Sequence, residues 1–314
     1  MNIAIAIPIY NESESVVDCL DKVNSQIKKL DSYDIDVICI NDGSEDNSLD
    51  LLEPFKNQIT ILSSDVNFGL SEVFNSVIQY TKEKNYNYLV IFDADLQYLI
   101  EDLETLLLKI NETKADILIG SRNFRSKNHF KVLKKYLQII GSKSISFILG
   151  KQIKDATSGY RVYSKRAINN LFTTNSFTYT LETLFQAVEK KLLIFNVELS
   201  GFNKTRESRL FKSNFEYLIK SFFVILKSIT LYRRKLLFKI LLVLSIPGFL
   251  LFSRFFITYF SQGYNAGNLQ SLIVGTFYLV ILFLIYILIF QYISYVKMNT
   301  KLMQIEYKAK HKKY

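Results

Sequence analysis

The N-terminal part of the chain alternates short apolar runs with longer stretches in which apolar residues recur every three or four positions. Five short runs have the length and composition of strands buried on both faces: residues 3–7, 36–40, 59–62, 88–92 and 116–119. Three longer stretches have helical spacing: residues 13–30, 71–84 and 100–110. This alternation predicts an α/β fold, with right-handed strand–helix–strand units around a mostly parallel sheet.

Polar residues follow four of these strands at the point where each strand ends. They occupy positions 8–12, 41–44, 93–95 and 120–122. The carboxyl ends of parallel strands form one edge of a sheet, and ligands bind there in open α/β sheets. We therefore expect one site to contain these four segments.

After residue 200 the pattern changes to long apolar stretches. Residues 213–235 are rich in Leu, Ile and Phe, with Lys220 and Lys227 seven positions apart on one helical face. This pattern predicts an amphipathic helix that lies in a membrane interface.

Two membrane spans are expected after this helix. Residues 269–296 form a run of 28 residues without a charge, more than the roughly 20 that a helix needs to cross a bilayer. Residues 236–260 predict a second, kinked span, because Lys239 and Arg254 bracket 14 uncharged residues that Pro247 interrupts.

The formal net charge of +10 is concentrated beside the apolar stretches. Residues 1–203 hold 22 basic against 26 acidic side chains, whereas residues 204–239 hold 10 against 2 and residues 297–314 hold 6 against 1. Basic residues beside membrane helices mark the cytoplasmic side. We therefore expect the two helices to form a hairpin whose two ends both lie in the cytoplasm. The domain of residues 1–212 and the basic tail would then be cytoplasmic as well. A nucleic-acid-binding protein would carry its positive excess on the folded domain, which excludes that class.

The start of the chain and its cysteines agree with a cytoplasmic domain. Residues 3–7 lack a preceding basic region and run directly into Pro8, so they predict a strand and not a signal peptide. Cys19 and Cys39 have no spacing typical of a zinc site or a disulfide framework, and we expect both to be buried thiols.

Asp93 and Asp95 stand two positions apart directly after an expected buried strand. Two carboxylates so close repel one another unless a cation lies between them. Mg²⁺ or Mn²⁺ held by such carboxylates completes its coordination with water and substrate phosphates, and it would neutralise charge on a departing nucleoside diphosphate. The alternative is a solvated Asp-x-Asp turn that caps the next helix.

Four ordered motifs resemble those of family-two glycosyltransferases with the type A fold, which is Rossmann-like. They are Pro8-Ile9-Tyr10-Asn11-Glu12, Asn41-Asp42-Gly43-Ser44, Asn67-Phe68-Gly69 and Phe92-Asp93-Ala94-Asp95-Leu96-Gln97. Three later features are similar to the polyprenyl-phosphate branch, the dolichyl-phosphate mannosyltransferase-like enzymes. They are Asp155-Ala156-Thr157-Ser158-Gly159-Tyr160-Arg161, Glu182, and the basic run of residues 204–209. The resemblance covers residues 1–215 in detail.

The resemblance implies a role for each residue of these motifs. The residues of the nucleotide-sugar pocket would be Pro8, Tyr10, Glu12, Asp42, Asp93, Ala94 and Arg122. The metal ligand would be Asp95, supported by Asp93 and Gln97. The residues at the reacting sugar would be Asp155, Arg161 and Glu182, and those that bind the lipid phosphate or the diphosphate would be Lys204, Arg206 and Arg209.

Several of these roles have a structural alternative that the sequence leaves open. The alternatives are a strand end at Pro8, a helix cap at Glu12, a turn at Asp42 and an ordinary surface ion pair at Arg122. Residues 158–160 belong either to the site or to a tight turn into a strand. Asp155 orients either the sugar or the neighbouring Arg161, because a phosphate acceptor is already anionic near neutral pH and needs no strong general base.

One motif departs from the branch. Residues 203–209 read Asn-Lys-Thr-Arg-Glu-Ser-Arg and lack the leading Arg and the Gly of the Arg-x-x-Gly-x-Ser-Lys that the branch usually shows. Three cations remain for a phosphate, and the last is an arginine, whose planar fork differs from the ammonium of lysine. The missing Gly removes the residue that would allow a close backbone approach.

Together these features predict an inverting, metal-dependent transfer of a hexose from a UDP- or GDP-sugar to undecaprenyl phosphate at the cytoplasmic membrane face, inversion being implied by the resemblance alone. The main alternative is a family-two transferase that uses a hydroxyl of a glycan or of a lipid-linked saccharide, with Asp155 or Glu182 as general base. A catalytically silent scaffold is a third reading.

Processive synthases of the family share a Gln-x-x-Arg-Trp motif, and this chain has no Trp. It also lacks the glycine-rich motifs of dehydrogenases and P-loop kinases.

The sugar and the oligomeric state stay open, including a homo-oligomer. Apolar helices often associate through small residues, but Gly248, Gly267 and Gly275 are too scattered to predict a packing seam.

Overall fold

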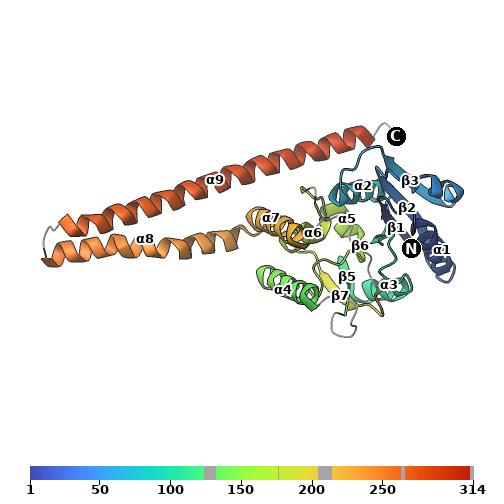
Figure 1. The fold of residues 1–314 in the computed structure, drawn as a ribbon, viewed down its shortest axis with the longest axis horizontal. Coiled ribbons are helices and arrows are strands. Elements are labelled where there is room, and N and C mark those ends of the chain that lie inside the picture. Colours follow the sequence, from blue (N-terminus) through green and yellow to red (C-terminus); the bar gives the residue numbers. More distant parts are fainter. Residues whose placement is uncertain (124–131, 176, 204–213, 263–265, 312–314) are drawn as a thin grey trace. The chain divides into compact units, whose positions relative to one another are not determined.

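The computed structural model describes residues 1–123, 132–175, 177–203, 214–262 and 266–311. The chain divides into two compact units, Met1–Ile225 and Leu226–Tyr314 (Figure 1). The N-terminal unit is an α/β domain, and the C-terminal unit consists mainly of two long helices.

In the part of the chain that the structure describes, a seven-stranded sheet has the order β3-β2-β1-β4-β6-β5-β7. The strands are β1 (Asn2–Ile9), β2 (Asp34–Asp42), β3 (Ile59–Ser64), β4 (Tyr88–Ile91), β5 (Ile117–Ser121), β6 (Arg161–Ser164) and β7 (Ile194–Glu198). The first five match the predicted runs, and the parallel pairs β1–β2, β1–β4, β2–β3 and β5–β7 confirm a mostly parallel sheet. The antiparallel strand β6 lies between β4 and β5, so residues 158–160 do lead into a strand.

Helices cover both faces of this sheet. They are α1 (Val16–Ile27), α2 (Leu70–Glu83), α3 (Asp102–Thr113), α4 (Val132–Leu149), α5 (Lys165–Asn170) and α6 (Tyr179–Glu189), with the 3₁₀ turn η1 (Asp50–Phe55). Ile3, Ile5 and Ile7 of β1 share one buried core with the apolar faces of α1 and α3. Side chains alternate along a strand, so Ala4 and Ala6 face the other side, where α2 contacts β1. Burial on both faces explains the continuous apolar runs of the sequence.

Both cysteines are buried in this domain as free thiols, as predicted. Cys19 lies on α1 and Cys39 lies on β2. Burial raises the pKa of Cys39 to about 12 and raises that of Cys19 still further.

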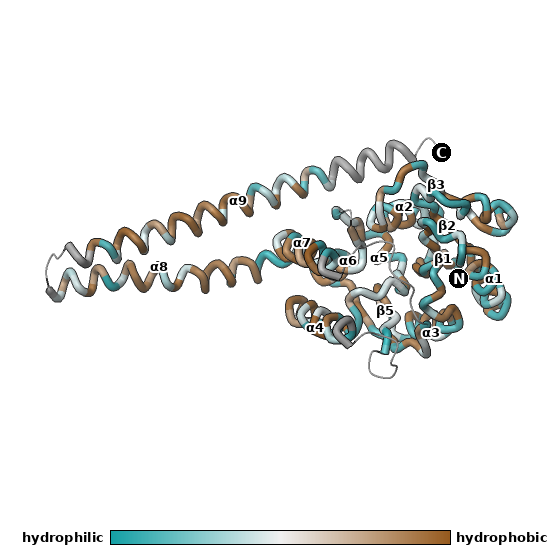
Figure 2. Tube along the Cα trace, in the orientation of Figure 1, coloured by the Kyte–Doolittle hydropathy of each residue, from teal (hydrophilic) through white to brown (hydrophobic). Residues whose placement is uncertain are grey.

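Helix α7 (Asn214–Tyr232) lies where an amphipathic interfacial helix was predicted, and its contact with a membrane stays a prediction. Helices α8 (Arg234–Gln262) and α9 (Ala266–His311) follow it. The segments Arg234–Ser261 and Leu269–Thr300 are long and apolar enough to cross a membrane, and few of their residues are buried inside the molecule. Figure 2 shows the apolar residues along both segments. The two predicted spans therefore correspond to helices, and α8 continues through Pro247.

Helices α8 and α9 approach closely at Gly248 and Gly275. A Cβ on Gly275 would lie 3.0 Å from the carbonyl oxygen of Gly248, and a Cβ on Gly248 would lie 2.8 Å from the ring of Tyr278. The Tyr278 hydroxyl donates to the carbonyl of Leu244 at 2.8 Å. The hairpin therefore brings these two distant glycines together within one chain, and a packing seam between copies stays an open question of the sequence analysis.

The turn after β2 depends on Gly43. Its φ of +67° lies in the left-handed region, and a Cβ there would lie 2.5 Å from the carbonyl carbon of Val66. That atom belongs to the backbone, so no rotation of a side chain relieves the contact. Gly43 therefore lets the loops after β2 and β3 lie against one another.

We expect Gly43→Ala to lower the melting temperature of the purified chain more than Gly150→Ala does. Both glycines have a positive φ, which costs a residue with a side chain about 1–2 kcal/mol, but a Cβ on Gly150 would meet no atom within 4 Å. Thermal unfolding followed by circular dichroism measures the two shifts. Equal shifts would contradict the close approach at Gly43.

Candidate active site

Hydrogen bonds join the loops that follow β1 and β2 at the carboxyl edge of the sheet. The backbone N–H of Asn11 donates to the hydroxyl of Ser44 at 3.1 Å, and Oδ1 of Asn11 accepts from the N–H of Glu45 at 2.8 Å. The N–H of Glu12 donates to the hydroxyl of Ser48 at 2.8 Å. The first two predicted motifs therefore form one continuous wall.

Three of the predicted pocket residues, Pro8, Tyr10 and Glu12, are partly buried at the end of β1. The carboxylate of Glu12 accepts a hydrogen bond from the Ser15 hydroxyl at 2.9 Å, just before α1. This contact joins two side chains before the helix and does not cap a backbone N–H of α1, and the nucleotide roles of these residues stay predictions.

The carboxylate of Asp42, at the end of β2, is buried and bonded to backbone. Its two oxygens accept from the N–H groups of Phe68 and Gly69, each at 2.9 Å. Gly69 is the N-cap of α2, so Asp42 satisfies amides that the start of that helix leaves unpaired. Contact of Asp42 with a base or a ribose stays a prediction.

The Asp-x-Asp pair follows β4 in a tight turn. Oδ1 of Asp95 accepts from the N–H of Gln97 at 3.1 Å, Leu96 has a φ of +56°, and the intervening Ala94 is buried. Burial, followed by the charge of Asp95, raises the pKa of Asp93 to about 7. The two carboxylates thus lie in an environment that penalises their combined negative charge.

This pair fits a divalent cation that takes its other ligands from elsewhere. Among the residues that the structure describes, no group of three or more His, Cys, Asp or Glu side chains could hold a metal ion by itself. Asp93 and Asp95 supply hard oxygen donors, and Mg²⁺ commonly combines one or two carboxylates with water and substrate phosphates. We therefore retain Asp93, Asp95 and Gln97 as the predicted metal-binding residues.

Gly159 limits the space beside Asp93. A Cβ on Gly159 would lie 2.8 Å from Oδ2 of Asp93. The N–H of Gly159 donates to the hydroxyl of Tyr98 at 3.2 Å, and its carbonyl accepts from the hydroxyl of Tyr179 at 3.0 Å. The sequence analysis missed the two buried tyrosines, and the only sequence signal was the position of Tyr98 directly after the motif of residues 92–97.

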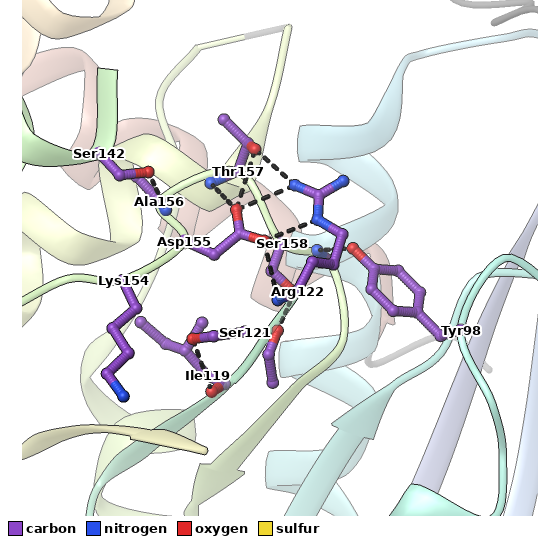
Figure 3. Close-up of polar contacts among 12 residues, drawn as sticks. Tyr98, Ile119, Ser121, Arg122, Ser142, Lys154, Asp155, Ala156, Thr157 and Ser158 are labelled. Carbon is purple, nitrogen blue, oxygen red and sulfur yellow. Dashed lines mark hydrogen bonds and ion pairs between the residues drawn. The ribbon is translucent and has the colours of Figure 1, made fainter. Parts of the chain in front are cut away.

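Arg122 and Asp155 form a buried ion pair beside this turn (Figure 3). Nε of Arg122 lies 2.6 Å from Oδ2 of Asp155, and Nη2 lies 2.9 Å from Oδ1. The two side chains are 9% and 0% exposed. Burial would raise the pKa of Asp155, but the charge and hydrogen bonds of Arg122 outweigh burial and lower that pKa. Asp155 therefore pairs with Arg122 and not with Arg161, and the pair lies in the interior and not at the surface.

Other groups also fix the guanidinium of Arg122. It donates to the Thr157 hydroxyl at 2.8 Å and lies 5.5 Å from the ring of Phe202. Its positive charge lowers the pKa of Asp93, against the larger opposite effect of burial. A fixed cation and the carboxylate pair therefore share one polar edge of the sheet.

Arg161 and Glu182, predicted at the reacting sugar, are buried and bonded to the chain itself. The guanidinium of Arg161 donates to three backbone carbonyls and to the Thr183 hydroxyl. The carboxylate of Glu182 accepts from the backbone and side chains of Thr174 and Asn175, and from Gln186. These contacts are those of residues that position loops. The predicted Lys204, Arg206 and Arg209 lie outside the described residues.

Comparison with known proteins identifies relatives of this arrangement. Residues 4–172 match the model of glycosyl transferase family 2. The chain is 30% identical over 196 residues to a poly(ribitol-phosphate) beta-glucosyltransferase of Bacillus spizizenii, a match that covers 56% of this chain and only 30% of that protein. It is 24% identical over 253 residues to an undecaprenyl-phosphate 4-deoxy-4-formamido-L-arabinose transferase of Photorhabdus laumondii, covering 79% of this chain and 74% of that protein.

A solved structure shares the fold. Glucosyl-3-phosphoglycerate synthase from Mycobacterium tuberculosis, in complex with Mn²⁺, UDP-glucose and phosphoglyceric acid, superposes with a TM-score of 0.55 at 15% identity. The match covers 72% of this chain and 79% of that one. It confirms the predicted fold class, a type A glycosyltransferase domain.

We expect Arg122→Gln and Asp155→Asn each to destabilise the N-terminal unit by about 3–5 kcal/mol, because each leaves a buried partner unpaired. The double variant should lose less unfolding free energy than the sum of the two single losses. A double-mutant cycle of urea unfolding at pH 7 measures the difference. Additive losses would show that the two charges are not coupled.

The same pair predicts sensitivity to acid. The folded-state pKa of Asp155 lies below that of an unfolded aspartate, about 3.9. The stability that the pair contributes is therefore present above about pH 4 and is lost as the pH falls through the folded-state pKa. Asp155→Asn should remove this part of the acid dependence of unfolding.

We expect Gly159→Ala to weaken Mn²⁺ binding by about tenfold or more, because a displaced supporting group typically costs a metal site that much. The added methyl would press on the Asp93 carboxylate. Titration followed by electron paramagnetic resonance, with a nucleoside diphosphate present, measures the affinity. Gly141→Ala on α4, where a Cβ would meet no atom within 4 Å, is the matched control. Equal affinities in the two variants would argue against Asp93 as a ligand.

Proposed function

The chain belongs to glycosyl transferase family 2, and from this premise we propose that it transfers a hexose, with inversion, from a UDP- or GDP-sugar to undecaprenyl phosphate. Mg²⁺ or Mn²⁺ is the proposed cofactor, and the cytoplasmic face of a membrane is the proposed location. An oxygen of the acceptor phosphate forms the new bond to the anomeric carbon as the bond from that carbon to the nucleoside diphosphate breaks.

The observation that carries the proposal is the placement of Asp93 and Asp95 beside the buried pair of Arg122 and Asp155. A divalent cation bound at the carboxylates would neutralise charge that develops on the leaving diphosphate. Arg122 supplies a second, fixed cation, which Asp155 orients and which costs no rearrangement during the reaction. The wall that contains Pro8, Tyr10, Glu12 and Asp42 is the proposed nucleotide pocket.

The state of the other carboxylates supports a phosphate acceptor. A hydroxyl acceptor needs a general base, and such a base works best with a pKa near the operating pH. The pKa of Asp155 is instead lowered by Arg122, and Glu182 is occupied by amide and hydroxyl donors. A phosphate is already anionic near neutral pH and needs no such group. The relative from Photorhabdus laumondii is named for undecaprenyl phosphate.

The C-terminal helices support attachment to a membrane, where a lipid acceptor resides. We propose that α8 and α9 span it as a hairpin, with residues 1–212 and 297–314 in the cytoplasm, because basic residues flank both ends of the hairpin. Lys204, Arg206 and Arg209 precede α7 in the sequence and are the proposed contacts for the lipid phosphate or the diphosphate.

The second candidate is transfer to a hydroxyl of a glycan or of a lipid-linked saccharide. The 30% identity to the poly(ribitol-phosphate) beta-glucosyltransferase favours it. The two candidates share the donor site and differ in the acceptor, so one assay separates them.

We expect the purified chain to label undecaprenyl phosphate from one member of a panel of radiolabelled UDP- and GDP-sugars, and only with Mg²⁺ or Mn²⁺. Asp95→Asn should lower the rate by about 100-fold or more, as the loss of one group that stabilises developing charge typically does. Label in the organic-extractable lipid measures transfer. Asp31→Asn, in an exposed loop before β2, is the matched control and should keep full activity.

Consumption of donor only with a glycan or glycolipid hydroxyl would establish the second candidate. If the chain consumes no donor with any acceptor in the panel, the result would argue for a scaffold that has lost turnover.

A further inference from the structure

The chain that leaves β7 lies beside the residues that follow the Asp-x-Asp motif, about a hundred positions earlier in the sequence. The N–H of Ser200 donates to the carboxylate of Asp102 at 3.0 Å. Tyr98 and Phe202 form an antiparallel bridge, and their rings meet edge to face with centroids 5.5 Å apart. The segment after β7 therefore supports the turn that carries the predicted metal ligands.

Asn203, the next residue, makes two hydrogen bonds to this turn. Its backbone N–H donates to the carbonyl of Gln97 at 2.8 Å, and its side-chain Nδ2 donates to the carbonyl of Leu96 at 2.9 Å. Asn203 stands where the polyprenyl-phosphate branch usually has the leading arginine of its basic motif. The bond to Leu96 therefore belongs to the departure of this chain from that motif.

The bond from Asn203 reaches Asp95 through a single peptide group. The carbonyl of Leu96 and the N–H of Gln97 belong to the same planar unit, so they turn together. The carbonyl accepts from the Asn203 amide, and the N–H donates to Oδ1 of Asp95 at 3.1 Å. A hydrogen bond to the carbonyl also polarises the N–H on the other side of the peptide and strengthens its bond to the carboxylate.

This peptide group needs support because Leu96 has a strained backbone. Its φ of +56° lies in the left-handed region, which is unfavourable for a residue with a side chain. Such a conformation persists only where surrounding contacts hold it. Return of Leu96 to an ordinary conformation would turn the peptide and move the N–H of Gln97 away from Asp95.

We propose that Asn203 is a positioning residue of the metal site, whose side-chain amide holds the Leu96–Gln97 peptide and, through it, the carboxylate of Asp95. The position that lacks the arginine thus serves the cation. The inference rests on the proposed function in one respect, that Asp95 binds the cation, and it is independent of the sugar and the acceptor.

The test compares Asn203→Ala with Asn170→Ala in the purified full chain. The side chain of Asn170 is also exposed and also donates to a backbone carbonyl, that of Arg166 at 2.8 Å, but it does so within helix α5. Titration with Mn²⁺ followed by electron paramagnetic resonance, with UDP present and again with GDP present, measures the affinity. Asp95→Asn is titrated alongside, and urea unfolding of each variant measures its stability.

We expect Asn203→Ala to weaken Mn²⁺ binding by about tenfold, because the loss of a group that orients a metal ligand typically costs that much. Asn170→Ala should bind Mn²⁺ as the unaltered chain does. The two variants should have similar unfolding midpoints, since both side chains are exposed. A lower midpoint in Asn203→Ala than in Asn170→Ala would show a general structural role and overturn the inference.

Two further outcomes separate this inference from the proposed function. Unchanged Mn²⁺ affinity in Asn203→Ala, beside a clear loss in Asp95→Asn, would overturn the inference and leave the proposed metal site intact. Unchanged affinity in Asp95→Asn would overturn both.

A second variant tests the path through Leu96. Glycine adopts a positive φ without the cost that a side chain brings, so Leu96→Gly should make the turn less dependent on Asn203. Asn203→Ala should therefore weaken Mn²⁺ binding less in the Leu96→Gly chain than in the unaltered chain. Equal losses in the two backgrounds would show that Asn203 does not act through this peptide, and they would overturn the inference.

Discussion

The polar edge of the sheet depends on one buried guanidinium. Arg161, at the start of β6, is 0% exposed, and a charge in such a place is tolerated only if its donors are bonded. Three of its bonds are to backbone carbonyls, which belong to Ala156, Ser158 and Thr180. The loop before β6 must wrap around the side chain to make them. Because that loop carries both Asp155 and Gly159, the ion pair with Arg122 and the space beside Asp93 follow from the same constraint.

The strands of the first half of the domain could be predicted because each contains a short apolar run, and β1, β4 and β5 are buried on both faces. Strands β6 and β7 were not predicted, because β6 begins with a charged residue and polar residues interrupt the apolar residues of β7. Helix α4 escaped prediction because polar and apolar side chains are mixed on both of its faces, although Ile145 and Leu149 are buried. Ser142 faces the interior and is bonded there, whereas Phe147 faces outward.

Motifs predicted residues of the site but not their partners in the structure. Arg122 and Asp155 are 33 positions apart, and no local pattern in the sequence predicts that their side chains form an ion pair. The sequence also cannot tell whether Asp42 serves a ligand or the start of a helix, because one carboxylate suits both. The structure shows the second contact in detail. The sequence predicts well which polar residues lie at the end of each strand. It does not predict the hydrogen bonds and ion pairs that hold those residues in place.

The buried thiols of Cys19 and Cys39 have a consequence for how motion in this domain can be observed. Thiolates are the species that react with alkylating reagents, and burial keeps both groups protonated and covered. Modification of the native chain therefore requires the layer of α1 over β2 to separate, and the rate of labelling reports how often it does so. The labelling rates of these two thiols therefore measure local opening in the part of the domain that carries the first two motifs.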